Sequence, residues 1–339
     1  MTSKTGASVS MADIARLAGV SESTVSRALN NNPAINVDTR ERIHQIAHKL
    51  NYRMNMGARN LRLRRTHTVA VVINTEIQTG QSFTDPFMMD MVSMIADELN
   101  RSGYSLLFAS TSLNRKDWHT HLIASRRADG IIIIGAGKYD LPIKNLYASG
   151  DPLVVWGSTR DKAPYCVVGS DNVQGGRLAT EYLLKQGRTR IAFLGDTRHP
   201  EVRDRHQGYT DALTEAGLAP VNEKLLLKSF RYDSAQERLE TTLRQIESLP
   251  FDGLVAASDM VAMGSIKALQ NCGYRVPDDV SVVGYDDIPM ANVFTPALTT
   301  VRQDIERGAK LLVKKILTQI KEQKANSTTL PVRLVRRES

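Results

Sequence analysis

From Thr68 onward, short and continuous apolar runs alternate with amphipathic segments of helical spacing. The runs are TVAVVI, YSLLFAS, GIIIIGAG, PLVVWGS, RIAFLGD, LLLKSF, GLVAASD and VSVVGYDD. Strands without polar alternation are buried on both faces, which is typical of parallel sheets covered by helices. Two successive series of such units predict an α/β core of two doubly wound parallel-sheet lobes. The helices expected between the strands span 87–101, 118–127, 175–186, 208–216, 234–249 and 261–271.

Polar side chains follow several of these strands. Asp171, Asp259 and the pair Asp286-Asp287 each come directly after an apolar run. Ligands of doubly wound sheets bind beyond the carboxyl ends of the strands, so we expect these groups near a cleft between the lobes. Asp171 and Asp259 are equally suited to capping the following helices. Arg203 and Arg205 are expected just before a helix, where a cation opposes the helix dipole and needs a carboxylate or ligand partner.

Ahead of this core, the stretch 10–30 (SMADIARLAGVSESTVSRALN) reads as two short helices separated by a turn. Ser10 and Ser21 are suitable N-caps, and Gly19 stands where the backbone needs positive φ. The second helix has an apolar face and a polar face, the latter carrying Glu22, Ser23, Ser26 and Arg27. This pattern is typical of a helix-turn-helix, although an ordinary helical hairpin has the same pattern.

A third helix is expected after Asp38, which forms a capping box with Glu41. Ile43, Ile46, Ala47 and Leu50 follow with helical spacing, so this helix would complete a small three-helix core. His44 and His48 lie four residues apart on it, and we interpret them as an exposed basic face and expect no metal site.

The excess positive charge is concentrated at the amino end. Residues 1–66 hold 11 Lys and Arg against 4 Asp and Glu, a net of +7 out of +8 for the whole chain. That distribution favours an arm that neutralises phosphates, joined to a nearly neutral body. A membrane-surface helix fits less well, because bulky aromatic anchors are absent from the first helices. Residues 51–66 (NYRMNMGARNLRLRRT) read as a basic linker, or as a hinge that orders on DNA.

Other function classes find little support in the sequence. GAGKYD at 135–140 lacks the third glycine of a dinucleotide fingerprint, and a Walker A loop and a GxSxG elbow are absent. Cys166 and Cys272 are far apart and are expected as free thiols. No apolar run is long enough to span a membrane, and the amino end lacks an apolar signal segment, so we expect a cytoplasmic protein. We therefore expect no catalysis and no cofactor.

Several motifs in this order resemble the lactose/galactose-repressor (LacI/GalR) family of bacterial transcription regulators. The resemblance extends from Met11 to Glu338 and rests on MADIARLAGVSESTVSRALN, ARNL, SDNVQGG, GRTRIAFLG, RHQGY, RVPDDVSVVGYDD and TPALTTVRQD. It implies a headpiece at 1–52, a hinge helix or linker at 53–66, and a periplasmic-binding-protein-like core at 67–339. Lobe 1 would comprise about 67–165 and 304–329, and lobe 2 about 166–303 and 330–339. No leucine heptads follow the last expected strand, so we expect a homodimer.

The resemblance also implies roles for individual residues on DNA. Base edges or nearby phosphates would be contacted by Ser21, Glu22, Ser23 and Arg27. Backbone positioning would fall to Thr24, Ser26, Asn30, Asn36 and Thr39. In the linker, Arg59 and Arg62 would contact phosphates and Leu61 would wedge into the minor groove. Met54 departs from the family, which usually has proline there before the hinge helix.

An effector would bind in the cleft, and the family's positions carry over to Phe87, Asp171, Arg205, Phe230, Ser258, Asp286 and Gln303. Carboxylate, guanidinium and amide groups with aromatic faces suit a sugar or sugar phosphate. Gly157 stands where many members carry an acidic group, so the effector's identity stays open. The sequence thus predicts a repressor of carbohydrate-utilisation genes whose affinity for a near-palindromic operator changes with effector. A periplasmic-type sugar receptor and a sugar kinase or dehydrogenase are the alternatives.

Overall fold

The computed structural model describes residues 9–52, 65–73, 84–110, 118–135, 141–160, 163–221 and 230–339. The chain divides into two units, Met1–Arg64 and Arg65–Ser339. The predicted linker residues Arg59, Leu61 and Arg62 lie outside the described residues, as does most of the predicted strand LLLKSF. Among the described residues, no helix combines the length and the apolar character needed to cross a membrane.

The first unit contains three helices: α1 (Met11–Ala18), α2 (Glu22–Leu29) and α3 (Val37–Lys49). Ile14, Val25 and Ile43 contribute one fully buried side chain from each helix. Gly19 ends α1 with φ of +64°, in the left-handed region that the predicted turn requires. The helix-turn-helix pattern predicted from the sequence is therefore confirmed.

The ends of the first two helices are capped as expected. Ser10 and Asp13 form a reciprocal capping box on α1, and the Ser21 hydroxyl accepts a hydrogen bond from the Thr24 amide on α2. The predicted cap of α3 is wrong. Its N-cap is Asn36, whose side chain accepts from the Asp38 amide at 2.9 Å, so the helix begins one residue before Asp38.

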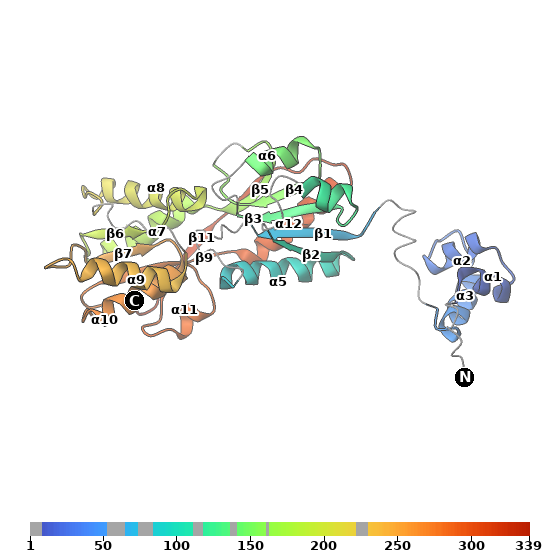
Figure 1. Ribbon diagram of the computed structural model, residues 1–339, viewed down its shortest axis with the longest axis horizontal. Helices are drawn as coiled ribbons and strands as arrows, with labels where there is room; N and C mark the ends of the chain where they lie inside the picture. Colours follow the sequence, from blue (N-terminus) through green and yellow to red (C-terminus); the bar gives the residue numbers. More distant parts are fainter. Residues whose placement is uncertain are drawn as a thin grey trace. The chain divides into compact units, whose positions relative to one another are not determined.

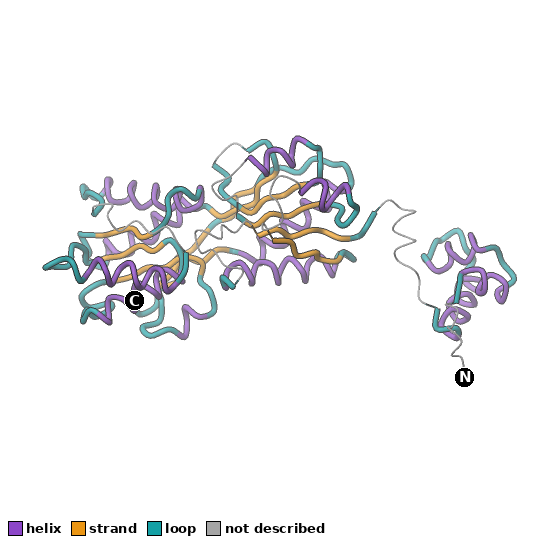
Figure 2. The backbone as a smooth tube through the Cα atoms, in the orientation of Figure 1, coloured by secondary structure: helices purple, strands orange, loops and turns teal. Residues whose placement is uncertain are grey.

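In the second unit, the described strands form two sheets (Figures 1 and 2). The first has the order β10-β5-β4-β3-β1-β2 and is parallel throughout. Its strands are β1 (Thr68–Ile73), β2 (Ser105–Ser110), β3 (Gly130–Ile134), β4 (Leu153–Trp156), β5 (Cys166–Ser170) and β10 (Thr328–Leu330). Helices α5 (Pro86–Arg101) and α12 (Ile305–Ile320) pack on one face. The π-helix η2 (His119–Ala124) and α6 (Leu141–Ala148) pack on the other.

The second sheet has the order β11-β9-β8-β7-β6. Its strands are β6 (Ile191–Leu194), β7 (Gly253–Ala256), β8 (Ser281–Asp286), β9 (Thr299–Gln303) and β11 (Val332–Val335). Helices α7 (Asn172–Lys185) and α8 (Pro200–Glu215) cover one face, and α9 (Tyr232–Leu243) and α10 (Asp259–Asn271) cover the other. The short helix α11 (Met290–Val293) follows β8. The lobe is not purely parallel as predicted, because β11 runs antiparallel to β9 at the edge.

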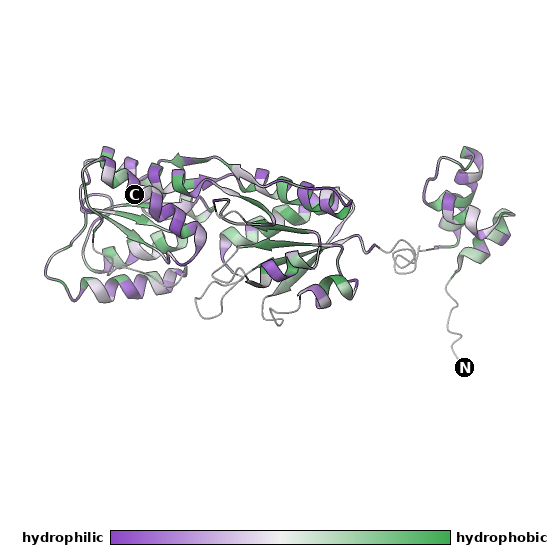
Figure 3. Ribbon diagram, turned by 90° about the horizontal axis from the view of Figure 1, so that it is seen from above, coloured by the Kyte–Doolittle hydropathy of each residue, from purple (hydrophilic) through white to green (hydrophobic). Residues whose placement is uncertain are grey.

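Most strands of the two sheets are buried on both faces, as their continuous apolar runs require, whereas the edge strand β2 leaves Phe108 43% exposed. All five residues of β3 are buried, and so are all four of β4, β6 and β7. Figure 3 shows this as apolar strands between helices of mixed hydropathy. The two predicted doubly wound lobes are therefore confirmed.

The boundary predicted between the lobes at 165/166 is wrong. Strand β5 pairs with β4 in the first sheet, so the first lobe extends to Ser170. The sequence analysis does not predict CVVGS as a strand, although its run of small and β-branched residues is typical of a buried strand. The chain passes between the lobes at Asp171, Asp304 and Pro331, and the Asp171 amide donates to the Leu330 carbonyl at 2.8 Å.

Helix α8 begins at Pro200, eight residues earlier than predicted. Proline at the first helical position has the required φ and lacks only an amide that would have no helical partner. Arg203 and Arg205 therefore lie within the helix, and the prediction that they precede it is wrong. Helix α9 likewise ends at Leu243, six residues before the predicted end.

Candidate functional site

The exposed face of α2 carries most of the side chains predicted to read DNA. Ser21, Glu22, Ser23 and Arg27 are all exposed. The Ser21 hydroxyl lies 2.8 Å from the Ser23 hydroxyl, which orders the amino end of the helix. Of the residues assigned to backbone positioning, Asn30 and Asn36 are exposed and Thr24 and Thr39 are half-buried.

Ser26 departs from the predicted polar face of α2. Only 8% of it is exposed, so it lies on the buried side of α2, as Val25 does. Its carbonyl oxygen accepts a hydrogen bond from the Asn30 side chain at 2.6 Å. Among the described residues no cluster fits a metal, and the His44 ring lies 3.2 Å from the Asn31 side-chain oxygen.

A cavity lies in the core at the carboxyl ends of strands from both sheets. We call it the inner cavity. It encloses about 600 Å³ of space between atoms, part of which is open to solvent. Its lining consists of Asp85, Phe87, Met88, Gly135, Trp156, His199, Glu201, Val202, Arg205, Phe230, Ser258 and Asp286. Five of the seven predicted effector residues are in this lining. Parallel sheets bring the ends of their strands to one edge, which explains why residues 200 positions apart meet here.

The polar groups of the inner cavity combine hydrogen-bond donors and acceptors with aromatic faces. Asp85 caps α5 and Ser258 caps α10, so each carries its hydroxyl or carboxylate at a helix amino end. Burial raises the pKa of the Asp85 carboxyl, since its charged form loses hydration. Phe230 is held edge-on by the His199 ring, with ring centroids 5.1 Å apart.

Arg205 is the best-anchored cation of the inner cavity. Its Nε donates to the Asn172 side-chain oxygen at 2.9 Å and Nη1 donates to the Ala257 carbonyl oxygen. Its guanidinium lies over the Tyr285 ring, 3.6 Å from the centroid. A guanidinium fixed by three partners is held in place before a ligand arrives, which reduces the cost of ordering it on binding.

Two glycines allow α8 to carry Arg205 so close to α7. A methyl carbon at Gly176 would lie 1.9 Å from the Arg205 carbonyl oxygen, and one at Gly208 would lie 1.9 Å from the Val173 carbonyl oxygen. Only glycine fits at either contact. Gly176 of SDNVQGG and Gly208 of RHQGY thus set the distance between the helices and the depth of Arg205.

Asp286 ends β8 in a backbone conformation that is rare outside glycine, with φ of +117°. Its carboxylate accepts a hydrogen bond from Gln303 Nε2 at 2.7 Å. Burial raises the pKa of Asp286 well above the ordinary range, and the positive charge of Arg205 opposes that rise. Strain of this kind persists where surrounding contacts hold the residue, and it is common at binding sites.

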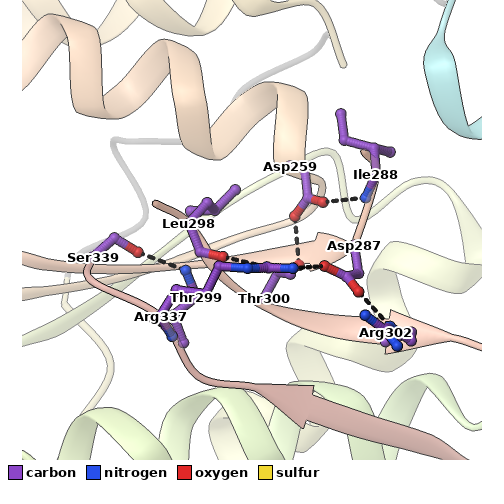
Figure 4. A network of polar contacts seen from close by, with 9 residues as sticks. All are labelled: Asp259, Asp287, Ile288, Leu298, Thr299, Thr300, Arg302, Arg337 and Ser339. Atoms are coloured by element: carbon purple, nitrogen blue, oxygen red, sulfur yellow. Dashed lines mark hydrogen bonds and ion pairs between the residues drawn. The ribbon is translucent and has the colours of Figure 1, made fainter. Parts of the chain in front are cut away.

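A network of polar contacts around the buried carboxyl groups of Asp259 and Asp287 lies next to Asp286 along the chain (Figure 4). Asp259 accepts hydrogen bonds from the Ile288 amide at 2.9 Å and from the Thr300 hydroxyl, and burial raises its pKa to about 7. Asp287 pairs with Arg302 and, at 2.7 Å, with Arg337. The carboxyl-terminal segment after β11 is thereby attached to β8 and β9.

The remaining two predicted effector residues are not in the described lining. Asp171 caps α7 by accepting from the Gln174 amide at 3.0 Å. Gln303 lies outside this lining but donates a hydrogen bond to Asp286, which belongs to it. Sequence reasoning missed Asp85, Met88, Gly135, Trp156, His199, Glu201 and Val202 as lining residues. Gly135 and Trp156 could have been found, because each stands at the carboxyl end of a predicted strand.

Comparison with known proteins shows to which family this chain belongs. Residues 10–55 match the family model of bacterial regulatory proteins of the lacI family, and residues 180–339 match the periplasmic binding protein-like domain. The HTH-type transcriptional repressor PurR of Erwinia tasmaniensis is 31% identical over 94% of this chain and 93% of its own length. The chain belongs to the lacI family.

Solved lacI-family structures share the whole architecture. A complex described as transcriptional regulator CelR with cellobiose is 29% identical, covers 98% of this chain and 99% of its own, and has a TM-score of 0.72. A lac repressor dimer bound to operator and the anti-inducer ONPF is 26% identical, with coverage of 98% and 99% and a TM-score of 0.85. The lacI-family headpiece and core are therefore those of a DNA-binding transcription regulator, as the sequence predicted.

Proposed function

We propose that this lacI-family chain is a homodimeric repressor of carbohydrate-utilisation genes, controlled by a neutral sugar in the inner cavity. It binds a near-palindromic operator, acts in the bacterial cytoplasm and catalyses no reaction. The observation that carries the proposal is the inner cavity itself, formed by both lobes of a core that is joined to a helix-turn-helix headpiece.

The lining of the inner cavity supports a sugar. Carboxylates and a guanidinium form paired hydrogen bonds with neighbouring hydroxyls, while aromatic rings such as Trp156 and Phe230 cover the C–H face of a pyranose. One solved relative binds cellobiose, and another is bound to operator as a dimer.

The charges favour a neutral sugar over a sugar phosphate. Asp85, Glu201 and Asp286 contribute three carboxyl groups, whereas Arg205 is the one guanidinium in the described lining. Arg205 already has three partners, so a phosphate would face carboxylates without a comparable cationic clamp.

Helix α12 offers a route from the inner cavity to the DNA-binding linker. Gln303, which holds Asp286, is followed by Asp304, the N-cap of α12. Sixteen residues later, about 24 Å along the helix axis, the Ile320 carbonyl oxygen accepts a hydrogen bond from Arg65 at 3.3 Å. Arg65 is the first residue of the core unit and lies near the end of the predicted linker 53–66. A sugar that favours one lobe arrangement would thereby change operator affinity by population shift.

Calorimetric titration of the purified full chain with neutral sugars and with their phosphates tests this proposal. We expect a neutral sugar to bind, and Arg205→Met to weaken binding at least tenfold. Arg275→Met is the matched control, because Arg275 is an exposed surface arginine paired with Asp279 outside the described lining of the cavity. Binding of the phosphates alone, or equal binding by both variants, would contradict the proposal.

A further inference from the structure

A second cavity adjoins the inner one. This outer cavity is lined by Thr84, Asp85, Pro86, Phe230, Arg231, Tyr232, Asp233 and Met260, and it shares Asp85 and Phe230 with the inner cavity. The two shared side chains make the cavities neighbours along one path. None of the residues predicted for effector binding, apart from Phe230, belongs to the outer cavity.

The outer cavity has an apolar floor and a polar rim. Pro86, Phe230, Tyr232 and Met260 are all half-buried, so each keeps part of its surface exposed. At the rim, Arg231 Nε donates to the Asp233 carboxylate at 2.8 Å, and this pairing lowers the pKa of Asp233 to about 2. Apolar side chains beside paired charged groups suit a pyranose ring, whose C–H face is apolar and whose edge carries hydroxyls.

Close packing of two helices fixes the backbone position of Tyr232. A methyl carbon at Gly264 of α10 would lie 2.3 Å from the Tyr232 carbonyl oxygen, so only glycine lets the start of α9 pack this close to α10. Met260 lies in the first turn of the same helix α10. Tyr232 and Met260 are therefore held beside each other by a rigid helix pair rather than by a loop.

Resting on the proposed function, we propose that the effector is a disaccharide or longer oligosaccharide. One pyranose occupies the inner cavity and the next lies on Pro86, Phe230, Tyr232 and Met260. Thr84 to Pro86 come from the first lobe, and Phe230 to Asp233 and Met260 come from the second. The second ring therefore bridges the lobes and adds to the free energy that stabilises the bound lobe arrangement.

Calorimetric titration with matched sugars tests this proposal. Glucose is compared with maltose and cellobiose, and galactose with lactose and melibiose, on the full-length wild type and three variants. Tyr232→Ala removes the ring, and Tyr232→Phe keeps the ring but removes the hydroxyl. Tyr147→Ala is the control, because Tyr147 is 44% exposed on α6 and lines neither cavity.

We expect one disaccharide to bind at least tenfold more tightly than its monosaccharide. Tyr232→Ala should weaken disaccharide binding about tenfold and leave monosaccharide binding unchanged. Tyr232→Phe and Tyr147→Ala should bind both kinds of sugar with wild-type affinity. If every monosaccharide binds as tightly as its disaccharides, the outer cavity holds no sugar and only the proposed function survives. If no sugar of either length binds, both proposals are wrong.

Discussion

Replacing Gly208 by alanine tests whether the close approach of α7 and α8 positions the effector cavity. The new methyl carbon would lie 1.9 Å from the Val173 carbonyl oxygen, and contacts shorter than 3.0 Å essentially never occur. The helices must therefore separate by about 1 Å. Overpacking costs about 1–3 kcal/mol, and we expect the upper end here because both atoms belong to helix backbones that cannot rotate away.

For a core of this size, a loss of about 3 kcal/mol lowers the melting temperature by roughly 6–12 °C. Thermal unfolding followed by circular dichroism measures the shift. Gly253→Ala is the matched control, since its methyl group would meet only side-chain atoms, the nearest an Ile191 carbon at 3.2 Å. Sugar affinity of Gly208→Ala should also fall about tenfold, because α8 carries Arg205. If Gly208→Ala melts within 2 °C of the control, the reasoning is refuted.

Three further changes probe other parts of the molecule. Burial raises the pKa of Asp259 to about 7, so its protonated form, which stabilises the fold, is lost as pH rises from 5 to 8, and the wild-type melting temperature should fall over that range. Asp259→Asn, whose side-chain oxygen can still accept the hydrogen bond from Thr300, should flatten the fall in thermal unfolding. Arg337→Ala should lower the free energy of unfolding by about 3–5 kcal/mol, measured by urea denaturation, because it removes a partner of the buried Asp287 carboxylate. Arg27→Ala should weaken operator binding in fluorescence anisotropy and reduce its salt dependence by about one counterion if Arg27 contacts phosphate; unchanged affinity would remove it from the interface.

Much of the architecture was predictable because burial leaves a clear pattern in sequence. Continuous apolar runs identified the parallel strands, and Gly19 with its flanking caps identified the helix-turn-helix. Element ends were less predictable, since they depend on single residues. Pro200 starts α8 and Asn36 caps α3, and both residues are also common in loops.

The inner cavity was predictable only in part. Phe87, Arg205, Phe230, Ser258 and Asp286 followed from the family resemblance, and their meeting point followed from strand order. The lining residues His199, Glu201 and Val202 were missed because the predicted start of α8 was eight residues too late. Gln303 lies outside the lining and contacts the cavity residue Asp286 through a 2.7 Å hydrogen bond. A sequence pattern does not reveal such a contact.

Selection of bound DNA from a random pool tests the central claim most directly. The full-length protein is used at physiological salt, with and without a panel of neutral mono- and disaccharides. The account predicts enrichment of a two-fold symmetric sequence whose recovery changes at least fivefold with one of the sugars. Failure to enrich any sequence would contradict DNA recognition by the headpiece, and enrichment that no sugar alters would contradict control through the inner cavity.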